Sequence, residues 1–176
     1  EEKEAMPMIE AIGRANAAGI PFAAASGNSG ADNATFNLYP ANANFPNVIS
    51  VGGTDELDKK ASFSNFNRYR VHLAAPGKDI VSTLPGNLYD NKSGTSMATP
   101  LVAGLIGLLK AHEPSLTGVQ ARALLQFTGT KISMETACSC RVDALSAVNA
   151  LVAKKMLITP ASAYLATGQT AKFATL

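Results

Sequence analysis

Apolar residues recur at helical spacing near the start of the chain and then gather in short continuous runs. Gly19 is a suitable residue to end the first helix. The run at residues 20–25 is short enough for a strand buried on both faces, and turn-forming residues 26–30 follow it. This order of helix, buried strand and polar loop is typical of an α/β fold. The helical positions are Met8, Ile9, Ile12, Ala15 and Ala18.

Further apolar runs predict more strands, with polar segments between them. The predicted strands cover residues 48–53, 71–75 and 80–83. Residues 31–47 are rich in asparagine and contain two prolines, which indicates a surface loop. Residues 87–93 are polar and predict a second loop.

Three helices are predicted in the second half of the chain. The first begins near Ser96, and its residues 101–109 are apolar on nearly all faces, which is typical of a buried core helix. Residues 117–120 form a capping-box pattern for a helix that runs to about Phe127. Asp143 is placed to cap the last helix.

Composition and charge narrow the class of protein. The chain has 176 residues, of which 47% are hydrophobic and 16% charged, so a sizeable core can form. Its 15 basic and 13 acidic residues form no long run of one sign, which indicates neither a nucleic-acid nor an anionic-membrane partner. The longest apolar run is too short to span a bilayer.

The two cysteines stand one residue apart, at Cys138 and Cys140. A bond between them would close a very small ring, which disulfide geometry resists, so we expect two small unbonded cysteines. The alternative is that one of them pairs outside this chain. As metal ligands they lack a second pair, and neither histidine is near in sequence.

Ser96 stands where a polar loop becomes an apolar helix. A serine there can simply cap the helix. It also lies at the positive end of the helix dipole, beside unpaired backbone N–H groups. That position suits a nucleophile whose reaction builds negative charge on a neighbouring oxygen.

Seven motifs in order resemble the subtilisin-like serine proteases, or subtilases. Gly94-Thr95-Ser96-Met97-Ala98-Thr99-Pro100, with Val102-Ala103-Gly104, resembles the family's nucleophile segment. Ala24-Ala25-Ser26-Gly27-Asn28-Ser29-Gly30 resembles its oxyanion-asparagine segment. The resemblance implies a three-layer α/β fold, with a mostly parallel sheet between helices, that is incomplete in this chain. The other matching segments are residues 45–52, 61–65, 75–77, 82–86 and 141–144.

The resemblance implies a role for five positions. Ser96 would attack the peptide carbonyl, and the oxyanion hole would combine the Asn28 side-chain amide with the Ser96 backbone N–H. Ala25, Ser26 and Gly27 would line the pocket for the substrate side chain, so the partner is a peptide or protein substrate. Catalysis in the family needs no cofactor. Members of the family are mostly secreted or reside in secretory compartments.

The catalytic triad also needs a histidine and an aspartate. The two histidines, His72 and His112, both follow Asn28 and lack the family's sequence context. We therefore expect residues 1–153 to be the C-terminal half of a catalytic domain, inactive alone and partnered by the upstream half. We expect residues 154–176 to hold a linker and the start of a further domain of β-sandwich type.

Two further readings stay open at this point. The chain could be a non-catalytic relative, a binding or structural module that kept the subtilase fold. Calcium commonly stabilises the family, and the asparagine-rich loop with Asp32 could supply oxygen ligands. Their spacing matches no calcium loop, and no metal-ligating residues are assigned.

Overall fold

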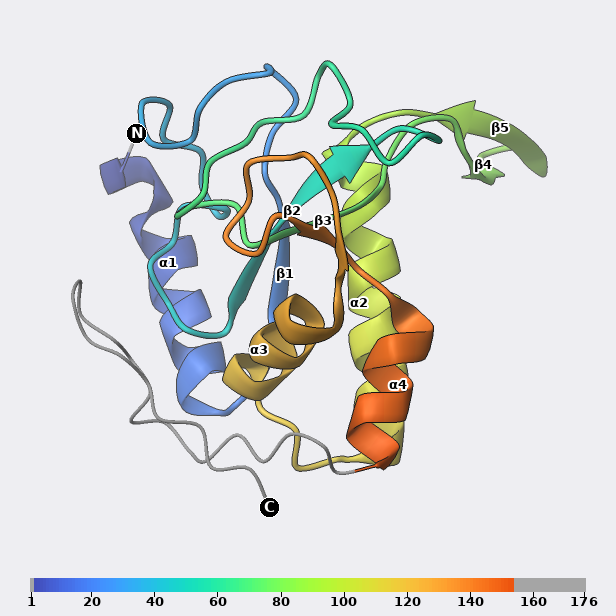
Figure 1. The fold of residues 1–176 in the computed structure, drawn as a ribbon. Helices are drawn as coiled ribbons and strands as arrows, with labels where there is room; N and C mark the ends of the chain where they lie inside the picture. The colour runs from blue at the N-terminus through green and yellow to red at the C-terminus, as the bar shows by residue number, and fades with distance from the viewer. Residues whose placement is uncertain (1, 154–176) are drawn as a thin grey trace.

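The computed structural model describes residues 2–153, which form a mostly parallel sheet between layers of helices (Figure 1). The sheet has the strand order β1–β2–β3–β7–β6. Neighbours from β1 to β7 are parallel, and β6 pairs antiparallel with β7. The expected α/β class is confirmed. The strands are β1 (Phe22–Ala25), β2 (Val48–Thr54), β3 (Leu73–Pro76), β6 (Thr130–Lys131) and β7 (Cys140–Arg141).

Helices cover both faces of the sheet because β2 sends apolar side chains to each side in turn. Val48 packs with Ile12 of α1 on one face. Ile49 and Val51 belong to the main core on the other face, which α2, α3 and α4 complete. The helices are α1 (Glu2–Ala17), α2 (Thr95–His112), α3 (Gly118–Thr128) and α4 (Ala144–Val152).

Two elements are less buried than their apolar sequences predict. β1 is the outer strand of the described sheet, and only Ala24 within it is fully buried. α2 buries a stripe that includes Val102 and Ile106, yet Leu101 is 44% and Leu108 58% exposed. The prediction of burial all round is therefore wrong for the described residues, which leave one apolar face of α2 uncovered.

The segment predicted as a polar loop at residues 87–93 instead contains a strand. β5 (Leu88–Lys92) pairs antiparallel with β4 (Ile80–Leu84), and the hairpin projects from the body of the molecule (Figure 1). Gly86 and Asn87 join the strands with positive φ values of 82° and 60°. Such left-handed residues are what tight hairpin turns require.

The asparagine-rich segment is only in part a surface loop. Asn33, Asn42 and Asn47 are buried, because their side-chain amides hydrogen-bond to the backbone. Asn47 Nδ2 donates to the Ile20 carbonyl at 2.9 Å, and Asn42 Nδ2 donates to the Asn33 carbonyl at 2.9 Å.

Both predicted helix caps are confirmed. Thr117 and Gln120 form a reciprocal capping box at the start of α3. The Asp143 side chain accepts a hydrogen bond of 2.9 Å from the Ser146 backbone N–H at the start of α4.

The expectation of two unbonded cysteines is wrong, because a disulfide joins Cys138 and Cys140. Ser139 between them takes a positive φ of 45°, and the two Cα atoms lie 5.1 Å apart. That separation is within the ordinary range for a disulfide, so the local backbone conformation removes the geometric objection.

No helix among residues 2–153 is long and apolar enough to cross a membrane. The segment expected to contain a linker and a further domain, residues 154–176, lies outside the described residues.

Candidate functional site

The two segments that carry the candidate chemistry meet where β1 ends and α2 begins. Ser96 is the second residue of α2 and is exposed. Gly94 is the N-cap, and no side chain caps this helix. The interpretation of Ser96 as a helix cap is therefore wrong, since its hydroxyl makes no hydrogen bond with any described residue.

The backbone before Ser96 is held in place by the loop that follows β3. The Gly94 N–H donates to the Gly77 carbonyl at 2.7 Å, and the Gly94 carbonyl accepts from Met97 N–H at 2.9 Å. The N–H of Ser96 belongs to the first turn, where a helix leaves its N–H groups without intrahelical partners. The start of α2 thus offers both a hydroxyl and a backbone donor.

Asn28 lies beside this helix start, although it is far from Ser96 in sequence. Its Oδ1 accepts two hydrogen bonds from Thr95, one from the backbone N–H at 2.8 Å and one from Oγ1 at 2.9 Å. Thr95 is fully buried, and its Oγ1 also accepts from the Gly27 N–H at 3.2 Å. Because these bonds fix the carbonyl end of the Asn28 amide, its NH₂ remains as a donor without a described partner.

The residues expected to line a substrate pocket, Ala25, Ser26 and Gly27, lead directly from β1 to Asn28. Ser26 and Gly27 are buried, and Ala25 is partly exposed. Gly27 has a φ of 114°, and a Cβ at this position would overlap the side chains of Asn65 and Leu38. Only glycine suits that backbone and that space.

A buried pair of asparagines supports the loop and was not expected from the sequence. Asn65 Oδ1 accepts from the N–H groups of Ser29 at 2.9 Å and Ala31 at 3.1 Å. Asn65 Nδ2 donates to Asn33 Oδ1, and Asn33 Nδ2 donates to the Ser26 carbonyl, both at 2.9 Å. Asn65 and Thr95 stand within the matched motifs, whereas nothing in the sequence singles out Asn33.

Neither histidine of the chain lies against Ser96. His112 ends α2, an 18-residue helix that is about 27 Å long, so the two residues are at opposite ends. His72 Nδ1 accepts from the Ser50 N–H at 2.9 Å, and its Nε2 is 3.5 Å from Arg122. Burial, and then the positive charge of Arg122, lower the pKa of His72 to about 3. His72 is therefore a neutral structural residue at neutral pH.

One oxygen suggested for a cation, Asp32 Oδ1, is used within the protein. Asp32 Oδ1 accepts from the Ala34 N–H at 2.8 Å and from Asn67 Nδ2 at 2.7 Å. Across residues 2–153 we find no group of three or more histidine, cysteine or acidic side chains that could hold a metal ion.

Sequence comparisons relate the chain to bacterial proteases. Residues 2–143 match the model of the subtilase family. The chain is 42% identical over 129 residues to alkaline elastase YaB of Bacillus sp. (strain YaB), covering 73% of this chain and 32% of that protein. It is also 42% identical over 123 residues to subtilisin BL of Lederbergia lenta, covering 70% of this chain and 44% of that protein. The chain thus spans less than half the length of these relatives.

Solved structures show the same likeness. A protease from Pseudoalteromonas arctica superposes with a TM-score of 0.74 and 28% identity, over 81% of this chain and 46% of that one. The protease domain of PatA superposes with a TM-score of 0.71 and 25% identity, over 83% of this chain and 53% of that one.

Proposed function

Because the chain belongs to the subtilase family, we propose that it carries the nucleophile and the oxyanion hole of a serine endopeptidase. One observation carries the proposal: Thr95, the residue before Ser96, donates two hydrogen bonds to Asn28 Oδ1. This pairing supports the proposal, because the residues that carry an exposed hydroxyl, a helix-start N–H and an amide NH₂ are then neighbours at the start of α2. These are the groups that acyl transfer needs.

In the proposed reaction, Ser96 Oγ adds to the carbonyl carbon of the scissile peptide bond and its proton passes to a general base. The carbonyl oxygen becomes an oxyanion, which accepts hydrogen bonds from Asn28 Nδ2 and the Ser96 N–H. The C–N bond then breaks, and the amine leaves with the proton returned by the base. Water attacks the acyl-enzyme in the same way and releases the acid and the free Ser96 hydroxyl.

The general base and its orienting aspartate are proposed to come from outside this chain. His72 has both ring nitrogens engaged, and His112 lies at the far end of α2. The partner would be the upstream half of the catalytic domain. The outer edge of β1 and the uncovered face of α2 with Leu101 and Leu108 suit such a partner. Without it, an unassisted serine is a weak nucleophile, and the chain alone would be inactive or nearly so.

The remaining assignments follow from the family. Substrates would be peptides or proteins, with Ala25, Ser26 and Gly27 beside the side chain that precedes the cut bond. The family resemblance is also the ground for proposing that the protein is secreted. On the same resemblance, a calcium ion would stabilise the fold, and catalysis would need no cofactor. We retain the proposal that residues 1–153 are the C-terminal half of a catalytic domain, followed at residues 154–176 by a linker and the start of a β-sandwich domain.

The test uses the intact protein, meaning this chain together with the proposed upstream half. It is labelled with a serine-reactive phosphonate, and the modified residue is located by mass spectrometry. We expect the label on Ser96, and none after Ser96→Ala. Ser82→Ala, which changes an exposed serine of β4, is the matched control and should keep the label. Proteolysis retained by Ser96→Ala would overturn the assignment.

The same experiment separates the proposal from the alternative of a non-catalytic binding or structural module. The presence of both Ser96 and Asn28 favours the enzyme, since Asn28 is hydrogen-bonded to Thr95, the residue before Ser96. Absence of label from the correctly folded intact protein would establish the module instead. This chain alone, labelled in parallel, should react far less than the intact protein if the base lies outside it.

A further inference from the structure

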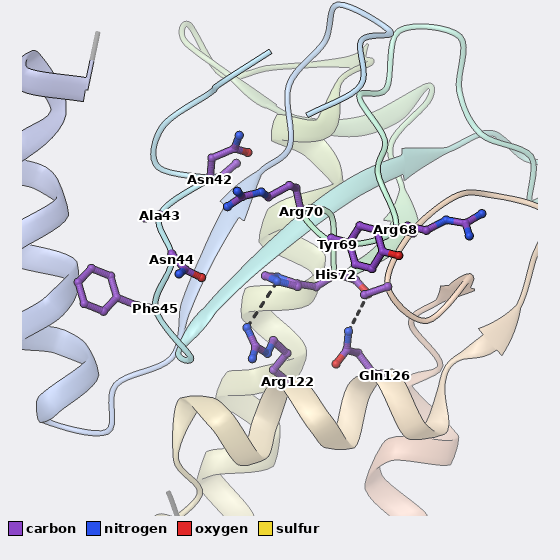
Figure 2. A pocket seen from close by; sticks show the side chains of 12 residues that line it. Asn42, Ala43, Asn44, Phe45, Arg68, Tyr69, Arg70, His72, Arg122 and Gln126 are labelled. Atoms are coloured by element: carbon purple, nitrogen blue, oxygen red, sulfur yellow. Dashed lines mark hydrogen bonds between the residues drawn. The ribbon is translucent and has the colours of Figure 1, made fainter. Parts of the chain in front are cut away.

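A pocket lies between the loop of residues 41–45, the segment of residues 68–72 and α3 (Figure 2). Its volume is about 400 Å³, and neither Ser96 nor Asn28 lines it. The proposed peptidase function gives this hollow no role.

The lining of the pocket is basic and polar. Arg68, Arg70 and Arg122 contribute guanidinium groups, and no aspartate or glutamate is among the lining residues. Guanidinium groups stay charged at all physiological pH values, so positive charge without lining carboxylates favours an anion here. The uncharged polar side chains on the lining are Asn42, Asn44, Tyr69, Gln126 and the neutral His72.

Arg70 is the side chain best placed to receive a ligand. It is exposed, and its guanidinium makes no hydrogen bond or ion pair with any described residue. Figure 2 shows it reaching from its own segment toward the loop that carries Asn42 and Asn44. Its backbone is fixed, because Asn67 Oδ1 accepts from the N–H groups of Tyr69 at 2.7 Å and Arg70 at 2.9 Å.

Arg122 rises from α3 on the opposite side of the pocket and points toward His72 (Figure 2). Its Nη1 donates to the Val48 carbonyl at 3.3 Å and lies 3.5 Å from His72 Nε2. These contacts hold the guanidinium in place, so a ligand would meet a positioned group rather than a mobile one. A preorganised donor loses less conformational entropy on binding.

Arg68 forms one weak ion pair, with a carboxylate that does not line the pocket. Glu135 pairs with Arg68 at 3.7 Å, and both side chains are more than half exposed, at 59% and 63%. Such surface pairs contribute little and are screened by salt. Arg68 can therefore turn toward an anion in the pocket at small cost.

We propose that this pocket binds a small oxyanion, a carboxylate or a phosphate group, between Arg70 and Arg122. The planar fork of a guanidinium matches both groups, and charge-assisted hydrogen bonds of this kind are the strong ones. The Gln126 side chain lies on the same cavity, where its Nε2 donates to the His72 carbonyl at 3.0 Å. Binding here does not depend on Ser96.

The test is calorimetric titration of the intact protein with inorganic phosphate and, in a separate arm, with sodium acetate, each at constant ionic strength. Saturable binding is expected in at least one arm, and the stronger arm identifies the class of ligand. Arg70→Gln should weaken it by about tenfold, the loss of one charge-assisted contact. Arg14→Gln removes another exposed charge, from a residue of α1 that does not line the pocket, and should leave binding unchanged.

Either of two results would overturn the proposal: no saturable binding in both arms, or equal affinity in Arg70→Gln and the parent protein. Because binding is measured without turnover, the result stands whether or not Ser96 labels. A second readout locates the anion, since the amide NMR signals of residues 41–45 and the side-chain NH₂ of Gln126 should shift with the same saturation curve. Shifts confined to other regions would count against the pocket.

Discussion

At the scale of single residues, the candidate site depends on a buried threonine more than on any exposed group except Ser96. Thr95 connects three parts of the site, because it donates twice to Asn28 and accepts from Gly27. The Asn28 side chain is otherwise exposed and would be free to rotate. Thr95 therefore acts as a positioning residue for the proposed oxyanion hole.

Replacing Thr95 by valine tests this role, because valine keeps the shape and the backbone N–H but removes Oγ1. We expect kcat of the intact protein to fall by roughly tenfold with KM little changed, since the Asn28 amide would act mainly in the transition state. Thr95→Ser restores the hydroxyl and should recover most of kcat. A change confined to KM, or no recovery by serine, would contradict the positioning role.

The sequence predicts Ser96 and Asn28 because each lies in a run of residues with a recognisable order. It does not predict the Asn33–Asn65 pair, because an amide buried within a loop looks like any other polar loop residue. Which asparagine becomes buried depends on where two distant segments meet. The same limit applies to the disulfide, whose feasibility depends on the positive φ of Ser139.

At the scale of elements, a run of apolar or β-branched residues correctly predicts β2 and β4, and the prediction fails at β5, which has no such run. β2 is buried throughout and its apolar run predicts it well. β5 is exposed along its whole length, so no alternation of apolar and polar residues marks it as a strand. α2 shows the reverse case, since its sequence is more apolar than the burial that the described residues provide.

The cap of α4 gives a prediction at this scale. The hydrogen bond from the Ser146 backbone lowers the pKa of Asp143 below its usual 3.8, so the ionised carboxylate stabilises the fold. Asp143→Ala should cost about 1 kcal/mol in the free energy of unfolding at pH 7. That stabilisation is present above pH 3.8 and is lost as the pH falls through the lowered native pKa.

Urea unfolding of the intact protein at pH 7 and at decreasing acid pH measures this loss. Asp143→Asn is the control, because asparagine caps a helix about as well and does not titrate. It should retain most of the stability at pH 7 without the dependence on pH. An alanine variant as stable as the parent at pH 7 would show that the cap contributes nothing.

At the scale of the whole molecule, the described sheet has its main core on one face and ends at β1 among the described strands. The main core joins β2 and β3 to α2, α3 and α4. The outer edge of β1 and the uncovered face of α2 with Leu101 and Leu108 are two surfaces against which the proposed upstream half could pack. The candidate site begins where β1 ends, so the proposed upstream half would pack beside both β1 and the segment that leads to Asn28.

His72 connects this architecture to acid stability. Its ring lies beneath the basic pocket, where Arg122 faces it directly and Arg68 and Arg70 line the same hollow. The folded protein holds it neutral, with a pKa of about 3 against 6.5 in the unfolded chain. Below pH 6.5 the unfolded chain therefore binds a proton that the folded one does not.

The contribution of His72 to the free energy of unfolding should accordingly be constant with pH above about pH 6.5. It should fall as the pH decreases from there toward 3, by at most about 1.4 kcal/mol per pH unit. His72→Asn removes the titration, and its side-chain oxygen can still accept from the Ser50 N–H. The variant should be less stable than the parent at pH 7, with the difference shrinking steadily toward pH 4 in denaturant unfolding. A constant gap between His72→Asn and the parent across this range would mean that burial does not suppress protonation of His72.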